Sequence, residues 1–542
     1  MTLLLVLSPI LILAVGAVVV MLVDAFQDEE GALAMPTALL HFSAAAMALA
    51  LWQRGIPADA NVLVHGWLAI DKVTLFLQAT VCLGGGLATL LAGGYLAEHR
   101  IDRGEYYPLL AFSTAGACLL VAANDTLMFF VALETMSLGV YAMTGFRRSS
   151  ARSAEAALKY FLLGSFAAAL FLMGAALLYA ITGHTDFPGI AQILHPATPV
   201  AVDANDANAL LQATLRTRVG ILGMLLMVVA MAFKIGAVPF HMWTPDAYEG
   251  APTSTMAYMS VVVKTAAFGA MLRVLLTLFG DAGSSAGGGG WPSLLAWIAV
   301  LTMTVGNLAA LAQTSVKRML AYSSIAHAGY LLLGIVAAPH ATAGPGAQAS
   351  VLFYLLGYTV SNIGVLGALI LAGRRGAEAV SYDDLAGYAR RHPAAGFAMA
   401  FFLLSLTGVP PTVGFFGKFY IIRSTLDAGY TGLAVIALIN SAVSAYYYLG
   451  VMVKMYMREP ALGAERAAPM KSFYVVSTLI VAAALVLAMG AMPERWLSLA
   501  GQATGVAPPT PAAADASDDG AAANPGGPAA APAPAPAPAP AH

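Results

Sequence analysis

Three lysines lie near the middle of long apolar segments of this 542-residue chain: Lys234, Lys264 and Lys418. A charge at the centre of a bilayer costs about 3 kcal/mol even on lenient insertion scales, and ionisable residues at that depth commonly mark ion or proton pathways. Prolines that interrupt a helix lie close to two of them, Lys234 and Lys418. The lysines therefore predict a path for protons or ions through a membrane.

The composition fits a membrane environment. The chain is 59% hydrophobic and only 10% charged, whereas soluble domains carry about 25% charged residues. A formal net charge of −2 gives no reason to expect nucleic acid as a partner. Cys82 and Cys118 lie in apolar runs without metal-ligand spacing, so we expect them to be small buried side chains. No CxxC, phosphate-binding or dinucleotide-binding motif is present, and we expect no cofactor or metal on this chain.

The apolar segments predict an all-α polytopic membrane protein. A spanning helix needs about 20 apolar residues, and about 14 such segments occur, near residues 2–23, 33–52, 70–96, 107–123, 125–145, 154–181, 217–240, 253–279, 292–313, 317–338, 348–372, 394–426, 431–456 and 471–491. Residues 2–23 lack a basic leader region, so we expect a first transmembrane helix there. Residues 183–216 are expected to form a longer loop.

The positions of the basic residues predict the orientation. Arginines concentrate in the odd-numbered loops, for example Arg147, Arg148, Arg390 and Arg391, and cytoplasmic loops carry the excess of basic residues. The odd-numbered loops are therefore expected to be cytoplasmic, and both termini are expected on the outer, periplasmic side.

Two segments combine a central lysine with prolines that break a helix. Lys234 precedes Pro239, whereas Lys418 follows Pro410 and Pro411. Freed backbone groups at membrane depth are tolerated only inside protein or beside a water-filled cavity, so we expect interrupted helices lined by water. The two segments lie five apart, which predicts two inverted five-helix repeats, as in many transporters. Helices that are merely kinked are the alternative.

These patterns divide the chain into five parts. Residues 1–105 are expected to form helices 1–3, residues 106–280 the first repeat and residues 281–457 the second, inverted repeat. Residues 458–505 are expected to contain helix 14. From about Val506 the chain is rich in Ala and Pro, which predicts a disordered, extended tail over residues 506–542.

A carboxylate accompanies the first of the lysines. Glu134 lies about ten residues into its segment, at a depth comparable to that of Lys234. A buried carboxylate needs a partner, so we expect the two to form an ion pair, and a static structural pair is the alternative. Lys264 has no acidic residue on its own helix. Because burial disfavours a charged amine, movement of a neighbouring charge would change the proton affinity of Lys264.

Four further residues complete the candidate set. Lys418 is expected to be the counterpart of Lys234 in the second repeat. His327 lies about ten residues into its segment, where it either relays protons or packs as a buried side chain. Lys159 lies near the cytoplasmic end of its helix, so it either takes part or snorkels to the interface. His241 flanks the first break and either stabilises it or conducts.

Four stretches carry a resemblance to a known family. They are residues 130–143 (FVALETMSLGVYAM), 234–273 (which begins KIGAVPFHMWTPDAYEGAPTS), 313–330 (QTSVKRMLAYSSIAHAGY) and 406–421 (LTGVPPTVGFFGKFYI). Together they resemble the antiporter-like membrane subunits of respiratory complex I. The sequence PFHMWTPDAYEGAPT is most similar to the subunit N branch of that family. The Ala/Pro-rich tail departs from the usual short C-terminus of this branch.

The resemblance implies roles for the residues that match the family motifs. It implies that Glu134 modulates Lys234, that Lys264 is the central proton-carrying lysine and that Lys418 belongs to the second broken helix. His327 falls on the central hydrophilic axis by position.

The resemblance also implies a function and a setting. The chain is expected to translocate protons in the inner membrane of a bacterium as a subunit of an NADH:quinone oxidoreductase. NADH, FMN, iron–sulfur clusters and quinone are expected to lie in partner subunits, and small membrane subunits and another antiporter-like subunit are expected to flank it. The alternatives are a subunit of a multi-subunit cation/proton antiporter, and a scaffold that moves no ions.

Overall fold

The computed structural model describes residues 2–26, 33–195, 206–280, 290–340, 342–373, 378–459, 470 and 472–505. Over these residues the structure is helical, and β-bridges occur only as the isolated pairs Leu68–Ala123, Asp125–Asp186 and Ser315–Ser381. The predicted tail from Val506 lies outside the described residues.

The helices follow one another along the described chain in the order α1 (Thr2–Val6), α2 (Ser8–Phe26), α3 (Ala34–Arg54), α4 (Ala60–Leu63), α5 (Lys72–Glu98), α6 (Tyr106–Ala122), α7 (Thr126–Thr144), α8 (Ala151–Thr182), α9 (Phe187–Leu194), α10 (Ala207–Ile235), α11 (Trp243–Gly250), α12 (Thr253–Tyr258), α13 (Lys264–Arg273), α14 (Trp291–Leu311), α15 (Val316–Ala337), α16 (Gly344–Ala372), α17 (Tyr388–Arg391), α18 (Pro393–Thr407), α19 (Val413–Asp427), α20 (Thr431–Met457), α21 (Phe473–Ala491) and α22 (Pro493–Ala503). Two π-helical segments, η1 (Met259–Val263) and η2 (Val274–Leu278), flank α13.

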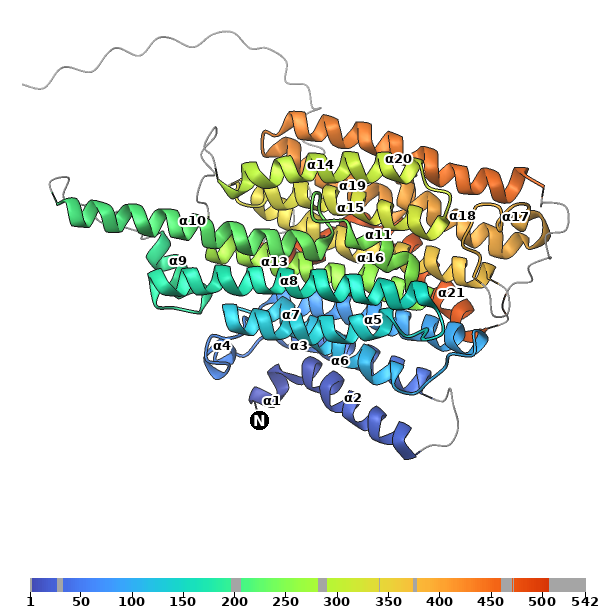
Figure 1. Ribbon diagram of the computed structural model, residues 1–542, viewed down its shortest axis with the longest axis horizontal. Coiled ribbons are helices and arrows are strands. Elements are labelled where there is room, and N and C mark those ends of the chain that lie inside the picture. The colour runs from blue at the N-terminus through green and yellow to red at the C-terminus, as the bar shows by residue number, and fades with distance from the viewer. Residues whose placement is uncertain are drawn as a thin grey trace, which may run out of the picture. The chain divides into compact units, whose positions relative to one another are not determined.

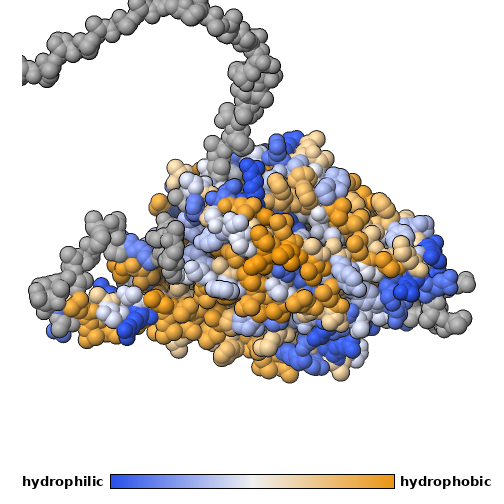
Figure 2. All heavy atoms as spheres, turned by 90° about the horizontal axis from the view of Figure 1, so that it is seen from above, coloured by the Kyte–Doolittle hydropathy of each residue, from blue (hydrophilic) through white to orange (hydrophobic). Residues whose placement is uncertain are grey.

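The predicted all-α polytopic fold is confirmed. Within the described residues, twelve helices are long and apolar enough to cross a membrane, and α6 and α18 are shorter apolar helices. The long helices run side by side, with their axes close to one common direction (Figure 1). Large apolar side chains remain exposed on them, such as Phe166, Trp297 and Ile480. Hydrophobic residues cover broad stretches of the face in Figure 2, as a bilayer-facing surface requires.

Two of the sequence-based boundaries are wrong. The first segment is not one helix, because a turn at Leu7 separates α1 from α2. The expected loop over residues 183–216 is shorter than predicted, because it contains α9 and the first turns of α10. Both of these helices begin at an aspartate that caps them: Asp186 accepts from the backbone N–H of Gly189, and Asp206 from those of Asn208 and Ala209.

Both proline-containing segments are interrupted, as predicted. Gly236 caps the C-terminus of α10 and Gly408 caps that of α18, and both glycines have left-handed backbone angles, with φ of 73° and 91°. A residue without Cβ adopts this conformation readily, so each glycine closes its half-helix. A cis peptide bond precedes Pro239 in the first interruption and Pro411 in the second.

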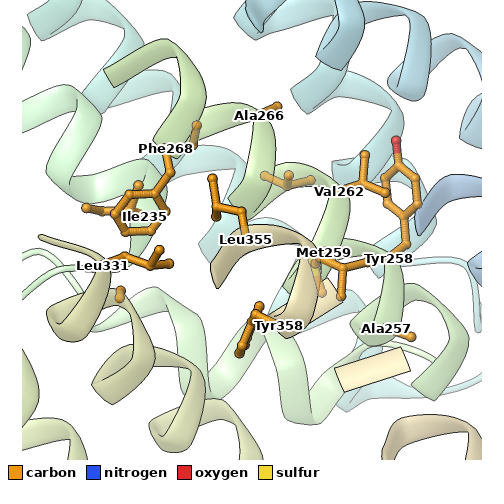
Figure 3. Close-up of a cluster of buried hydrophobic side chains, with 14 of the residues drawn as sticks. Ile235, Ala257, Tyr258, Met259, Val262, Ala266, Phe268, Leu331, Leu355 and Tyr358 are labelled. Atoms are coloured by element: carbon orange, nitrogen blue, oxygen red, sulfur yellow. The ribbon is translucent and has the colours of Figure 1, made fainter. Parts of the chain in front are cut away.

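The core lies where α10, α12, α13, α15 and α16 meet. Figure 3 shows buried side chains from these elements in one cluster, including Ile235, Phe268, Leu331 and Leu355. Glycines allow close packing elsewhere, since a Cβ on Gly116 would lie 2.4 Å from the backbone N of Met136. The result is a packed frame that holds a few polar side chains in fixed places.

Candidate functional site

The four central candidates are buried. Lys234, Lys264, His327 and Lys418 are between 4% and 7% exposed. None of the three lysines contacts a carboxylate in the part of the chain that the structure describes; their partners are hydroxyls, backbone carbonyls and tyrosine rings. An ammonium group thus has polar contacts at each of these sites without a carboxylate in direct contact among the described residues.

Lys234 is held by groups from two neighbouring helices. It lies in the last turn of α10, and its Nζ donates to Ser137 Oγ of α7 at 2.8 Å and to the Tyr160 hydroxyl of α8 at 3.4 Å. The Tyr141 and Tyr160 rings have their centroids 5.6 and 5.4 Å from the same nitrogen. Such a distance allows a cation–π interaction. The C-terminal end of a helix also favours a positive charge.

The predicted direct ion pair between Glu134 and Lys234 is not formed. Glu134 is half-buried on α7, and Ser137, one turn further along that helix, makes the contact with Lys234 instead. The carboxylate is nevertheless close enough to interact electrostatically with the ammonium. The prediction placed both charges at the same depth but could not determine which face of α7 points at Lys234.

Lys264 follows directly after a π-helical turn. The segment η1 ends at Val263, and Lys264 begins α13. Its Nζ donates to the backbone carbonyl of Ser324 at 2.5 Å and also to the Ser324 hydroxyl. The Tyr358 ring centroid lies 5.7 Å away. Single π-helical turns within α-helices often occur at functional sites, and this one was not predicted.

His327 joins three helices through tyrosine hydroxyls. Its Nδ1 lies 2.5 Å from the Tyr354 hydroxyl of α16, and its Nε2 lies 3.1 Å from the Tyr448 hydroxyl of α20. Both ring nitrogens therefore have a partner that can either donate or accept a proton. A small cavity beside the ring is lined by Tyr358 and Ser405, among other residues.

Lys418 reaches back into the second interruption. Its Nζ donates to the carbonyl of Thr407, the last residue of α18, at 2.8 Å and to Ser441 Oγ at 3.2 Å. The last carbonyls of a helix have no partner within it. Lys418, which follows the second interruption, thus donates to a free carbonyl at the end of the half-helix that precedes it. Lys234, by contrast, lies within the half-helix that precedes the first interruption.

Tyrosines connect these residues into a line. The Tyr358 ring lies 5.1 Å from the His327 ring, and the His327 ring lies 5.9 Å from that of Tyr330. The Tyr330 centroid lies 5.3 Å from the Nζ of Lys418. With the contact of Tyr358 to Lys264, the line runs from α13 to α19 without a gap in side-chain contact.

The first lysine connects to this line through aromatic rings. Tyr160, which contacts Lys234, stacks on Trp243 with centroids 4.3 Å apart. Trp243 meets the Tyr248 ring edge-on at 6.2 Å, and Tyr248 in turn interacts with Ser324, the partner of Lys264. The sequence analysis did not single out the tyrosines that connect the lysines and His327. Only the spacing of Tyr354 and Tyr358, four residues apart and so on one face of a helix, could have indicated that two of them act together.

Lys159 and His241 lie away from this line. The Lys159 side chain is 45% exposed and forms ion pairs with Glu155 at 2.7 Å and Asp246 at 2.9 Å. Asp246 also forms an ion pair with Arg318 at 2.9 Å. His241 is half-buried within the first interruption. Neither makes a hydrogen bond to Lys234 in the described part of the chain.

A buried ion pair at the helix ends was missed by the sequence reasoning. Lys317 is 1% exposed by side chain and lies 3.0 Å from Glu378, which is 15% exposed. Glu378 also accepts from the Thr253 hydroxyl at 2.8 Å and from the Tyr95 hydroxyl. No local pattern around Glu378 distinguishes it from an ordinary loop carboxylate.

Known proteins resemble the chain along most of its length. Residues 123–444 match the family described as NADH:quinone oxidoreductase/Mrp antiporter, TM. NADH-quinone oxidoreductase subunit N 1 of Sorangium cellulosum is 52% identical over 505 residues, which cover 91% of this chain and 97% of that relative. Subunit N of Trichlorobacter lovleyi is 40% identical and covers 92% of this chain and 96% of its own length.

Solved structures agree with this assignment. A chain of respiratory complex I from Thermus thermophilus with bound aureothin superposes with a TM-score of 0.72 and 32% identity, over 91% of this chain and 99% of its own. A chain of the Mrp complex from Dietzia sp. has a TM-score of 0.75 at 20% identity, over 93% and 97% of the two chains, and so shares the fold. This chain therefore belongs to the NADH:quinone oxidoreductase/Mrp antiporter membrane family, within its NADH-quinone oxidoreductase subunit N branch.

Proposed function

We propose that Lys234, Lys264, His327 and Lys418 are the proton-carrying residues of this complex I membrane subunit. The observation that supports the proposal best is the continuous line of contacts from Lys264 through Tyr358, His327 and Tyr330 to Lys418. Hydroxyls and imidazole nitrogens on this line can donate and accept protons. Proton translocation is the activity that fits the family.

The contacts of Lys264 suit a group that gains and loses a proton. Ser324 offers a carbonyl and a hydroxyl, which can accept from an ammonium and also from the N–H groups of a neutral amine. Because no carboxylate contacts Lys264 in the described residues, no fixed counter-charge holds the proton there. Moving one charge against 100 mV costs about 2.3 kcal/mol. This free energy corresponds to a change of roughly 2 units in the pKa of the group that carries the proton.

Glu134 is proposed to act on Lys234 through space. The pair interacts electrostatically without direct contact, so a change in the charge of either residue alters the proton affinity of the other without breaking a salt bridge. Lys159 and His241 are proposed at most to supply protons from the surface and the helix break. Lys159 forms an ion pair with Asp246, which lies in the first turn of α11, the second half of the broken helix.

The setting of the subunit follows from the same family. Electron transfer from NADH to quinone is proposed to take place in partner subunits, which hold FMN and the iron–sulfur clusters, while this chain holds no redox centre. Small membrane subunits and another antiporter-like subunit are proposed to flank it. The two repeats over residues 106–280 and 281–457, and both termini on the periplasmic side of the bacterial inner membrane, remain part of the proposal.

The antiporter alternative is less well supported. Relatives that are 52% and 40% identical carry the oxidoreductase name, whereas the Mrp complex chain is 20% identical and shares the fold alone. A scaffold without ion transport would leave the buried lysines without a role, although each costs about 3 kcal/mol at membrane depth.

The test uses membranes that contain the assembled complex with Lys264→Met, which keeps the bulk of the side chain. We expect NADH-driven proton pumping and quinone reduction to fall at least tenfold while the complex still assembles. Lys454→Met removes a lysine that is 37% exposed and is expected to leave both rates unchanged. Wild-type rates of both pumping and quinone reduction in an assembled Lys264→Met complex would exclude Lys264 as a carrier.

A further inference from the structure

A groove on the side of the helical bundle lies outside the proposed proton path. It has a volume of about 1310 Å³ and is lined mainly by α18 and α21. Its apolar walls include Phe397 and Phe401 from α18 and Ile480 and Leu487 from α21. Phe397 is 66% exposed and Ile480 is 64% exposed. These side chains therefore face outward, away from the packed core.

The groove has the length of a lipid chain. Its lining runs from Ser472 to Leu487 along α21, which corresponds to about 22 Å at 1.5 Å per residue. One leaflet of the hydrocarbon core is roughly half of 30 Å thick. The apolar walls are thus long enough to cross one leaflet and reach past the midplane of the bilayer.

One end of the groove is positively charged. Arg391 and His392 line it where α18 begins at Pro393, and Ser472 lines it where α21 begins at Phe473. Two helices therefore direct their positive N-terminal ends to this place. The buried Nε of Arg391 has no hydrogen-bond partner in the described part of the chain, and its guanidinium otherwise reaches only the Ala386 carbonyl at 3.4 Å. α17, which ends at Arg391, lies at the same end of the molecule as the start of α18 (Figure 1).

A second apolar hollow lacks this feature. It lies between α2 and α3, has a volume of about 500 Å³ and is lined by residues such as Val15, Val19 and Leu40, with no charged residue among the described ones that line it. Ordinary contact with bulk lipid suffices to cover such a surface. The groove between α18 and α21 differs because a donor group with free hydrogen-bonding capacity stands at its end.

We propose that this groove binds a diacyl phospholipid with an anionic headgroup. The phosphate would accept hydrogen bonds from Arg391 and lie at the start of α21, and the acyl chains would follow α18 and α21. Basic pockets between transmembrane helices at one membrane face bind anionic headgroups by the same chemistry. Positive charge complements the headgroup, and an outward-facing apolar wall complements the chains.

A bound lipid would also pack along one half of the second interrupted helix. α18 is the half-helix whose last carbonyl, on Thr407, accepts from Lys418. A lipid packed along α18 limits the tilt of this half-helix and so holds the Thr407 carbonyl under Lys418. This consequence rests on the proposed proton function, whereas the binding site itself does not.

The experiment labels the intact purified complex with a photoreactive phosphatidylglycerol that carries its reactive group near the end of one acyl chain. Labelled peptides are identified by mass spectrometry. Arg391→Gln removes the guanidinium that would donate hydrogen bonds to the phosphate, and Ile480→Trp fills the groove. Their controls are Arg423→Gln, an arginine that is 68% exposed, and Ile439→Trp, at an isoleucine of α20 that is 60% exposed.

We expect labelling of α18 and α21 to fall at least fivefold in Arg391→Gln and in Ile480→Trp, and to remain unchanged in both controls. An excess of phosphatidylcholine should compete less well than phosphatidylglycerol. Equal labelling in all four variants would overturn the proposal, as would cross-links from the wild-type groove to a partner polypeptide in place of lipid. Since the readout is labelling rather than pumping, failure of the proton proposal would leave this result standing.

Discussion

The Nζ of Lys317 donates to the Glu378 carboxylate at 3.0 Å and to the carbonyl of Ala251 at 2.8 Å. Ala251 caps the C-terminus of α11, the second half of the first broken helix. Thr253, which also donates to Glu378, begins the helix that leads to Lys264. The buried pair therefore fastens the joint between the interruption and the helix of the central lysine. It fixes the position of α11 relative to the start of α12.

Glu378→Gln is expected to destabilise this joint. Removing one partner of a buried ion pair leaves the other charge uncompensated, which typically costs about 3–5 kcal/mol. We expect the midpoint of thermal unfolding of the purified complex to fall by several degrees. Asp383→Asn is the matched control, because Asp383 pairs with Lys454 at 3.1 Å but is 83% exposed, and exposed pairs contribute about 0–1 kcal/mol. Equal effects of the two changes would contradict the role of the buried pair.

The same carboxylate predicts a pH dependence of stability. Burial alone would raise the pKa of the Glu378 carboxyl. The charge of Lys317 and the hydrogen bonds from Tyr95, Lys317 and Thr253 outweigh this effect and lower the pKa from the ordinary 4.5 to about 2. A carboxyl with a depressed pKa stabilises the fold fully above its unfolded value of 4.5 and loses that contribution as the pH falls toward 2. The contribution amounts to about 3 kcal/mol.

Thermal unfolding of the wild type between pH 6 and pH 3 measures this loss. Below about pH 4.5 the wild type should lose stability more steeply than Glu378→Gln, which lacks the titrating group. Parallel slopes for the two proteins would show that Glu378 does not titrate in this way.

Much of the fold and only part of the site were predictable from the sequence. The apolar segments predicted the long helices because bilayer thickness fixes their length, and prolines indicated both interruptions. Which side of a helix faces a partner depends on packing, so the contact of Ser137 with Lys234 in place of Glu134 was not predictable. The pair of Lys317 and Glu378 joins residues 61 positions apart, and no local pattern marks it.

Glu134→Gln and Ser137→Ala should separate electrostatic coupling from direct contact. Because Ser137 accepts from Lys234 and Glu134 does not, Ser137→Ala is expected to lower the thermal stability of the complex by removing a buried partner, which costs about 1–3 kcal/mol. Glu134→Gln should leave the unfolding midpoint almost unchanged but reduce NADH-driven pumping several-fold. A large loss of stability in Glu134→Gln would instead support a static structural pair.

Tyr354→Phe tests the proton relay at His327. The change removes only the hydroxyl that lies 2.5 Å from Nδ1, so the ring packing stays and one buried nitrogen loses its partner. A loss of about 1–2 kcal/mol in a transfer step corresponds to roughly a tenfold lower pumping rate. Tyr446→Phe, at a tyrosine that is 74% exposed, should pump at the wild-type rate. Equal rates in the two variants would remove the Tyr354 hydroxyl from the path.

Gly408→Ala tests the backbone of the second interruption. Gly408 has φ of 91°, and a Cβ there would lie 3.2 Å from Cδ of Lys418. The left-handed conformation costs an L-residue about 1–2 kcal/mol, and the added methyl group would displace the lysine from the Thr407 carbonyl. We therefore expect both a lower unfolding midpoint and a lower pumping rate.

The control for this change is Gly432→Ala on α20, where a Cβ would meet nothing within 4 Å and φ lies outside the left-handed range. Because the added methyl group meets no neighbour and the backbone is not strained, this variant should unfold near the wild-type temperature and pump normally. If Gly408→Ala lowered stability but left pumping intact, the position of Lys418 at the end of α18 would not matter for transport. If it abolished pumping in a stable complex, the contact between Lys418 and the half-helix end would be a working part of the path.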